Sequence, residues 1–263
     1  MVAINGIDIH YEIEGQGTPI VFVHGLGATS NVWHAQRTTL SKSFRVIVYD
    51  RGGCGRSAKS LTGYSIDGFA DELAGLLDHL DVPSAIVVGH SLGSMVAQRF
   101  AAKFAPRTQA LILAGGEAEL DAAGKKILTD RARAIETDGL LGVAAGWLNA
   151  VLSPATRECN AALAGLLREM FLGNDGKTYA AHCLALRDGN VRGDHKNIVC
   201  PTLLTVGDGD PVTPLRWQQE IARGIVDSRI RVIPNSAHFP MLESPVVFNT
   251  ALLDFLASLE PRG

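Results

Sequence analysis

Short apolar runs alternate with helical patterns along most of this chain, and this alternation restricts the fold more than any other feature of the sequence. Six of the runs read PIVFVHG, FRVIVYD, AIVVG, ALILAGG, PTLLTVGD and IRVIPN. Continuous runs of this kind are typical of strands that are covered on both faces. An earlier segment, IDIHYEIEG, alternates apolar and polar residues, which indicates a half-buried antiparallel strand. The sequence therefore predicts an α/β fold with a mostly parallel sheet flanked by helices.

Two helical patterns are clearest between the runs. One begins after a candidate N-cap, Ser65, and repeats apolar residues at spacings of three and four as far as Leu80. The other begins directly after Ser91 and ends before Pro106. Ser91 is therefore expected to lie between a buried strand and a helix.

The alternation breaks after the ALILAGG run. The next segment is rich in Ala, Leu and Arg and carries no strand pattern. We predict that residues 117–195 form a helical cap over the carboxyl ends of the strands, inserted into a core made of residues 1–116 and 196–263. A separate helical domain is the alternative, but the segment is short and the strands resume directly after it.

Charge and composition exclude several classes of protein. The net charge is −3 with both signs interspersed, so we expect no nucleic-acid surface. No apolar stretch approaches the ~20 residues that span a bilayer, and the first residues lack the pattern of a signal peptide. The four cysteines include no C-x-x-C pair, which favours free thiols over disulfides or a zinc site. We expect a cytoplasmic protein with no metal and no membrane contact; the sequence does not indicate its oligomeric state.

The run AIVVG leads into GHSLG, which places a serine between two glycines. A serine hydroxyl reacts only when it is exposed, lies near a base and faces donors for the oxyanion. A sharp turn from strand to helix exposes it, and Gly89 and Gly93 remove the side chains that would clash there. This is the G-x-S-x-G nucleophile elbow, so Ser91 is predicted to be the nucleophile.

The segment HGLG, after another buried strand, is the predicted oxyanion loop. Glycines allow such a loop to turn its backbone N–H groups inward. We assign the oxyanion donors to the N–H groups of Leu26 and Leu92. His24 is expected to brace this loop through backbone hydrogen bonds rather than act as a base, and His90 is expected to point away from Ser91.

The remaining partners of the nucleophile are predicted beyond the last two strands. A carboxylate that orients a histidine must lie past a strand tip. Asp210, in GDGDPVTP, is our choice, with Asp208 as its rival and Glu117 as a more distant candidate. His238, in SAHFPMLESP, is the histidine that completes the chain order Ser, Asp, His.

These motifs, in order and over almost the whole chain, resemble the α/β-hydrolase superfamily. The chain is most similar to the 3-oxoadipate enol-lactonase group, through RVIVYD, GRS, TYAAHCLALRD and NIVCPTLLTVGDGDPVTP. The resemblance implies hydrolysis of a small lactone or ester without a cofactor. Members of that group usually carry Arg-Gly-His-Gly after the YD strand, whereas this chain has RGGCG, and they carry a tryptophan shortly before Thr-Pro or Ser-Pro, whereas Trp147 lies a helical turn earlier. These departures leave the particular lactone open.

The expected partner is a small-molecule substrate, and a carboxylate is one group that it could carry. Arginine binds carboxylates well, so Arg187 and Arg51 are candidate partners for that group. Trp147 and His182 are candidate lining residues from the cap. For each of these four residues a purely structural role is the competing interpretation.

Three alternatives to an ester or lactone hydrolase stay open. The same catalytic residues could hydrolyse a C–C bond of a ring-cleavage product. They could also act on thioesters or amides, or form peracids, because a fold does not fix a substrate. A slow-turnover ligand receptor on the same scaffold is the alternative from another class, and Ser94, where most related enzymes have glycine, offers it some support.

Substitution of Ser91 tests the elbow assignment. Ser91→Ala should lower kcat by about 10⁴-fold while the protein still folds, because the nucleophile is removed. A phosphonate should label this one serine, as read by mass spectrometry. A label on Ser94 instead would contradict the assignment.

Overall fold

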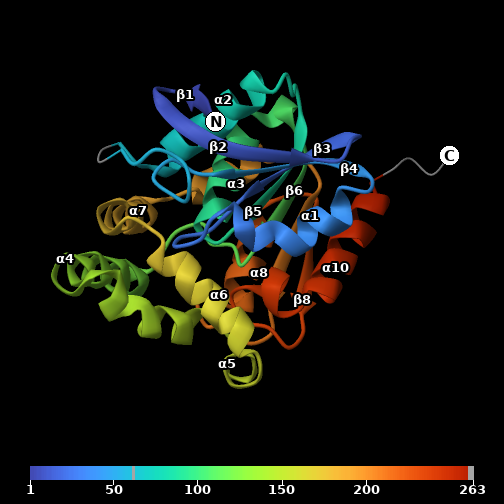
Figure 1. Cartoon of the computed structure of the whole chain (residues 1–263). Helices are drawn as coiled ribbons and strands as arrows, with labels where there is room; N and C mark the ends of the chain where they lie inside the picture. Colours follow the sequence, from blue (N-terminus) through green and yellow to red (C-terminus); the bar gives the residue numbers. More distant parts are fainter. Residues whose placement is uncertain (61–62, 260–263) are drawn as a thin grey trace.

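The computed structural model describes residues 1–60 and 63–259, and its centre is a sheet of eight strands (Figure 1). The strand order is β1-β2-β4-β3-β5-β6-β7-β8. β1 and β2 run antiparallel to their neighbours, and all the later pairs are parallel. The strands are β1 (Val2–Ile4), β2 (Ile7–Glu14), β3 (Thr18–Val23), β4 (Phe44–Asp50), β5 (Ala85–His90), β6 (Thr108–Ala114), β7 (Thr202–Gly207) and β8 (Ser228–Ile233).

This sheet confirms the predicted fold class. All six continuous apolar runs are strands, and the alternating segment is the antiparallel strand β2. Every residue of β5 and β7 is buried, as expected for strands covered on both faces. The short strand β1 had no signal of its own, because three residues are too few to show a period.

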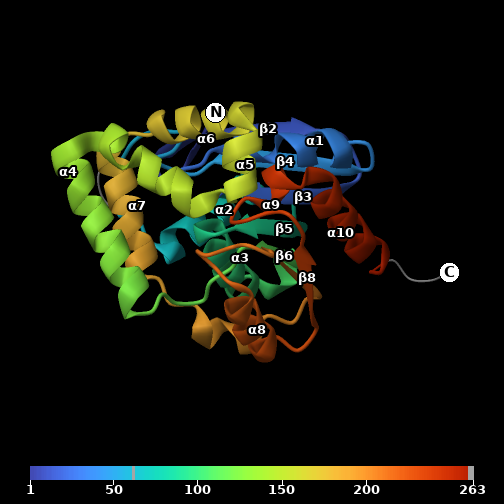
Figure 2. The same ribbon diagram turned by 90° about the horizontal axis from the view of Figure 1, so that it is seen from below.

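Helices cover both faces of the sheet (Figures 1 and 2). α1 packs with α10 on one face, while α2, α3 and α8 belong to the other. Ser65 caps α2 as predicted, since its hydroxyl accepts a hydrogen bond from the N–H of Gly68. In the described part of the chain, no helix has both the length and the apolar character needed to cross a membrane. The helices outside the segment after β6 are α1 (His34–Leu40), α2 (Ile66–His79), α3 (Leu92–Lys103), α8 (Leu215–Gly224), α9 (Pro240–Glu243) and α10 (Pro245–Ala257), with short 3₁₀ turns η1 (Ser30–Trp33) and η2 (Ala105–Arg107).

The segment between β6 and β7 is helical, and it lies as a separate group of helices beside the sheet (Figures 1 and 2). α4 packs against α7 and α6, and Gly139 kinks α4 with a φ of 66°. A bridge between Glu119 and Asn190 draws the two ends of the segment together. The division into a cap of residues 117–195 and a core stays a prediction. The elements here are α4 (Ala122–Val151), α5 (Pro154–Cys159), α6 (Ala161–Leu172), α7 (Gly176–Asp188) and η3 (Arg192–Asn197).

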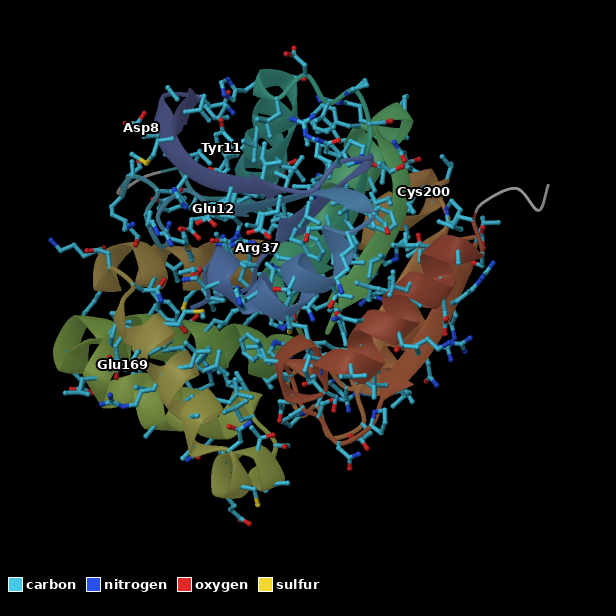
Figure 3. All side chains as sticks on the ribbon, turned by 45° about the vertical axis from the view of Figure 1, so that its right-hand side comes forward. Asp8, Tyr11, Glu12, Arg37, Glu169 and Cys200 are labelled. Carbon is cyan, nitrogen blue, oxygen red and sulfur yellow. The ribbon has the colours of Figure 1, made fainter. Side chains whose placement is uncertain are left out.

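An ion cluster ties α1 to the antiparallel edge of the sheet (Figure 3). The guanidinium of Arg37 lies 2.7 Å from a carboxyl oxygen of Glu12 and also pairs with Glu14. Burial disfavours the charged guanidinium, but the two carboxylates outweigh that effect and raise the pKa of Arg37. This anchor fixes the helix that follows the predicted oxyanion loop.

The connection between β5 and α3 depends on two close backbone contacts. A side-chain carbon on Gly93 would lie 2.2 Å from the backbone oxygen of Val23, and one on Gly89 would lie 2.2 Å from that of Gly93. These distances are too short for any side chain, so the two glycines allow α3 to approach β3 and β5.

Gly93→Ala should destabilise the protein by about 1–3 kcal/mol or more, because the backbone must move to relieve the overlap. Gly146→Ala is the matched control. Gly146 lies exposed in α4, where an added side-chain carbon would meet no atom within 4 Å, so alanine there should stabilise the helix by about 0.5–1 kcal/mol. Urea unfolding measures both, and equal effects would contradict the packing argument.

Candidate active site

A cavity of about 570 Å³ lies where four parallel strands end. Its floor includes Ser91 after β5, Glu117 after β6, Pro211 after β7 and His238 after β8. Other walls come from the helical segment, including Leu128, Arg131, Trp147 and Leu186. Ligands of open α/β sheets bind at this edge, and the volume suits a small molecule.

Ser91 occupies a strained turn at the end of β5. Its φ of 52° and ψ of −123° lie in a region that residues other than glycine rarely adopt. The Ser91 N–H donates to the Ala114 carbonyl at 3.0 Å, which ties the turn to the end of β6. Only 6% of the residue is exposed, and it borders the cavity. The turn thus presents one hydroxyl to the cavity, as a nucleophile elbow does.

The loop after β3 lies directly against this serine. A side-chain carbon on Gly25 would be 3.1 Å from Cβ of Ser91. Leu26 lines the cavity, and its N–H donates to no acceptor among the described residues. Leu92 is the first residue of α3, so its N–H has no acceptor within the helix. Both N–H groups assigned to the oxyanion are therefore available near Ser91.

His238 and Asp210 form a buried pair beside the cavity. Nδ1 of His238 lies 3.0 Å from Oδ2 of Asp210. The other carboxyl oxygen of Asp210 accepts from the N–H groups of Val212 and Thr213 at 2.8 and 3.0 Å. Burial alone would raise the pKa of Asp210, but His238 and these donors lower it, so the carboxylate is ionised. The pair leaves Nε2 of His238 as the ring nitrogen available to a substrate or to Ser91.

Ser91 and His238 line the same cavity but make no direct hydrogen bond in the described structure. Catalytic hydrogen bonds are often long in unliganded enzymes and tighten when substrate binds. Burial lowers the pKa of His238, yet the Asp210 carboxylate outweighs it and raises that pKa above its ordinary value. The arrangement can move a proton between a serine hydroxyl and an imidazole held in one orientation.

Neither of the two rival carboxylates makes a hydrogen bond with His238. Asp208 accepts hydrogen bonds from the N–H groups of Asn235 and Ser236, at 3.1 and 3.2 Å, and so closes the turn that precedes the histidine. Glu117 lines the cavity without any hydrogen bond to the imidazole.

Histidine and arginine side chains brace the loop after β3, which is the predicted oxyanion loop. The ring of His24 accepts from the Arg51 N–H at 3.1 Å and contacts the Gly25 carbonyl, as expected of a bracing residue. Burial lowers the pKa of His24 to about 3, so its ring is neutral. His90 borders the cavity, but its ring is buried against Trp33 and Phe239, and its Nε2 donates to the His238 carbonyl at 2.7 Å.

The structure brings only one of the four candidate substrate contacts to the cavity. Trp147 lines it and stacks on Phe171 at 4.6 Å. Arg51 is fully buried elsewhere, where its guanidinium donates to two carbonyls of the oxyanion loop. His182 is buried against Cys54, with 3.5 Å between Nδ1 and Sγ. Arg187 lies at the surface and pairs with Asp188 at 2.7 Å.

Sequence reasoning missed Arg131, the arginine of α4 that lines the cavity. It makes no ion pair with any described residue, and its guanidinium opposes the rise in the pKa of Tyr179 that burial causes. Its helix carries three other basic residues, so nothing in the sequence singles it out. Arg131 is identified only by the position of α4 at the wall of the cavity.

Comparison with known proteins shows which proteins share this architecture. A family profile described as the alpha/beta hydrolase fold matches residues 18–245. An enol-lactonase from Burkholderia xenovorans superposes with a TM-score of 0.94 at 27% identity, covering 97% of this chain and 99% of that one. A thermophilic esterase from Thermogutta terrifontis, described as malate bound, has a TM-score of 0.91 at 30% identity, covering 96% and 94%. A protein of Azorhizobium caulinodans provisionally named carbamate hydrolase RutD is 29% identical over 96% of each chain.

The pair of Asp210 and His238 predicts the pH dependence of activity. A base must be neutral to accept a proton, so kcat/KM should fall as the pH drops through the raised pKa of His238, with a midpoint above about 6.5. Asp210→Asn should lower kcat by about 10⁴-fold, because the histidine then adopts the wrong tautomer. The acid limb of its residual activity should move to lower pH.

Asp208→Asn is the control for this substitution, since Asp208 does not contact the histidine. It should cost far less activity and leave the acid limb in place. A large loss in Asp208→Asn with little loss in Asp210→Asn would contradict the assignment, and pH–rate profiles of the three proteins decide.

Proposed function

The chain belongs to the alpha/beta hydrolase fold family, and we propose that it is a serine hydrolase that cleaves a small carboxylic ester or lactone through an acyl-enzyme. The observation that carries the proposal is the cavity shared by the strained Ser91 and the His238–Asp210 pair. The enol-lactonase and esterase relatives support this bond type.

In the proposed mechanism Ser91 attacks the acyl carbon while Nε2 of His238 takes the hydroxyl proton. Asp210 holds the opposite nitrogen, which fixes the tautomer and stabilises the imidazolium. The N–H groups of Leu26 and Leu92 then bind the oxyanion. His238 passes the proton to the leaving oxygen, and a water activated by the same histidine hydrolyses the acyl-enzyme.

Several features support this assignment of roles. The hydroxyl of Thr213 donates to Oδ2 of Asp210 at 2.7 Å, so it holds the carboxylate in line with the imidazole. The brace of His24 and Arg51 keeps the oxyanion loop against Ser91. Preorganised donors of this kind need no rearrangement during the reaction, and loss of a single donor typically costs about 10²–10³-fold in rate.

We further propose that residues 117–195 act as the cap and set substrate choice. They supply one wall of the cavity, where Leu128 and Trp147 are apolar and Arg131 carries a charge without an ion-pair partner among the described residues. A carboxylate that enters such a space needs a cation, or the cost of its desolvation is uncompensated. Arg131 therefore replaces Arg187 and Arg51 as the candidate partner of a substrate carboxylate.

A matched pair of esters tests the proposal. The wild type should hydrolyse monomethyl glutarate and methyl pentanoate with repeated turnover, and Ser91→Ala should hydrolyse neither. Arg131→Ala should raise KM for the acidic ester by about ten-fold or more, because hydrogen bonds to charged groups contribute ~1.5–3 kcal/mol. It should leave the neutral ester almost unchanged.

Arg187→Ala is the matched control, since Arg187 lies outside the cavity. It should change neither substrate's kcat/KM. Equal losses on both esters in Arg131→Ala would remove the carboxylate site but not the esterase. A single slow burst without turnover on either ester would favour the receptor alternative.

A further inference from the structure

Glu117 is an ionisable group in the cavity that the proposed mechanism does not use. It follows β6 by three residues and is only 2% exposed. Neither carboxyl oxygen makes a hydrogen bond with a described residue, and Oε1 is buried with no partner there. Native proteins leave few buried polar atoms unpaired, so this carboxyl calls for an explanation.

The backbone of Glu117 is fixed, which keeps the side chain in place. Its N–H donates to the Ser94 hydroxyl at 3.4 Å, and its carbonyl accepts from the Gln98 amide at 2.9 Å. The side-chain oxygen of Gln98 in turn accepts from Nε2 of His195 at 2.8 Å. Two residues of α3 thus hold the backbone of Glu117, and η3 supports one of them, while the carboxyl stays without a partner.

No cation in the described structure pairs with this carboxyl. The nearby charges are His238, which favours the carboxylate, and Asp210, which opposes it. Burial has the largest effect and raises the pKa of Glu117 to about 7. A structural role for the Glu117 carboxyl would require a hydrogen-bond or ion-pair partner in the protein. Glu117 is not the acid that orients the histidine, because Asp210 already accepts the hydrogen bond of Nδ1 of His238.

We propose that Glu117 is a specificity residue, whose carboxyl binds a hydrogen-bond donor of the substrate close to the bond that is cleaved. This inference rests on the proposed function and narrows its substrate class. The hydrogen-bond donor is a hydroxyl or an amine on the acyl part of an ester or lactone.

The position of the donor follows from the neighbouring backbone. A side-chain carbon on Gly115 would lie 3.2 Å from Nδ1 of His238, so the chain leaving β6 passes directly against the base. Glu117 lies two residues farther and interacts electrostatically with that base. Because Glu117 lines the same cavity as Ser91 and His238, between which the acyl carbon must sit, we place the donor on the atom beside the carbonyl.

The two substitutions that test this role differ in what they leave behind. Glu117→Gln keeps the shape and an acceptor oxygen but removes the charge. Glu117→Met keeps a similar volume and removes the acceptor. Glu119→Gln is the matched control, because Glu119 pairs with Lys125 at 3.1 Å near the surface and does not line the cavity.

The substrates are γ-butyrolactone and its α-hydroxy and α-amino derivatives, which differ in one group beside the carbonyl. The wild type should prefer both substituted lactones by about ten- to a hundred-fold in kcat/KM. Glu117→Met should abolish both preferences. Glu117→Gln should abolish the preference for the amine and keep part of that for the hydroxyl, and Glu119→Gln should keep both.

Two further measurements distinguish an effect on substrate recognition from an effect on folding and from an effect on the catalytic step. Replacing an unpaired buried carboxyl with methionine should leave the midpoint of thermal unfolding unchanged or raised, whereas loss of a structural residue would lower it. Calorimetry on Ser91→Ala and Ser91→Ala/Glu117→Met measures the same preference for the intact lactones without turnover.

The outcomes are distinct for the two proposals. A preference that survives Glu117→Met, or a wild type that does not favour the substituted lactones in turnover or binding, overturns the role of Glu117 while ester hydrolysis stands. If no ester or lactone is turned over, the proposed function fails, and the binding preference in Ser91→Ala still decides for or against Glu117.

Discussion

The turn at Ser91 is the constraint on which the rest of the site depends. A residue other than glycine in this conformation costs on the order of 1–3 kcal/mol, so the surrounding packing must hold it. The contact between Gly93 and the backbone of Val23 does this, since it presses α3 against β3 at the point where the oxyanion loop begins. The strained turn, the proposed nucleophile and the N–H groups proposed to bind the oxyanion are therefore parts of one backbone arrangement. A chain that folds into this sheet forms them together.

The opposite wall of the site is held by charge rather than by backbone packing. Asp210 is buried and ionised because His238 and the donors around Thr213 compensate for its desolvation. The same carboxylate makes the imidazole more basic than burial alone would allow. The Asp210 carboxylate thus makes His238 the stronger base, while His238 and the Thr213 donors keep Asp210 ionised. Asp208 acts indirectly, because it accepts a hydrogen bond from the Ser236 N–H and so fixes the turn that precedes His238.

The sequence predicted the sheet, the elbow and the Asp210–His238 pair because each has a local signal. The apolar pattern of each strand and the glycines of the turn lie within a few residues of the groups that they position, and the order of the motifs is read directly from the sequence. The proposed substrate contacts have no such signal, because they depend on which residues α4 and α7 bring to the cavity. Arg187 matched a family stretch but faces solvent, whereas Arg131 had no motif and lines the cavity. Arg51 was a candidate substrate contact, yet it lies outside the cavity, and two of its guanidinium nitrogens donate to the loop after β3.

Two ionisable side chains in the cavity lack ion-pair partners, and this distinguishes them from the ionisable side chains that stabilise the fold. Arginine and glutamate side chains elsewhere mostly find partners, as Arg37 does at the sheet edge. Inside the cavity, the guanidinium of Arg131 and the carboxyl of Glu117 make no ion pair in the described structure. Folding alone gives no reason to keep either one, since apolar residues of similar size would stabilise the protein at least as well. A substrate that supplies an anion at the α4 wall and a donor near Ser91 would compensate for both at once. Recognition is therefore the simplest physical account of why these two groups coexist in one cavity.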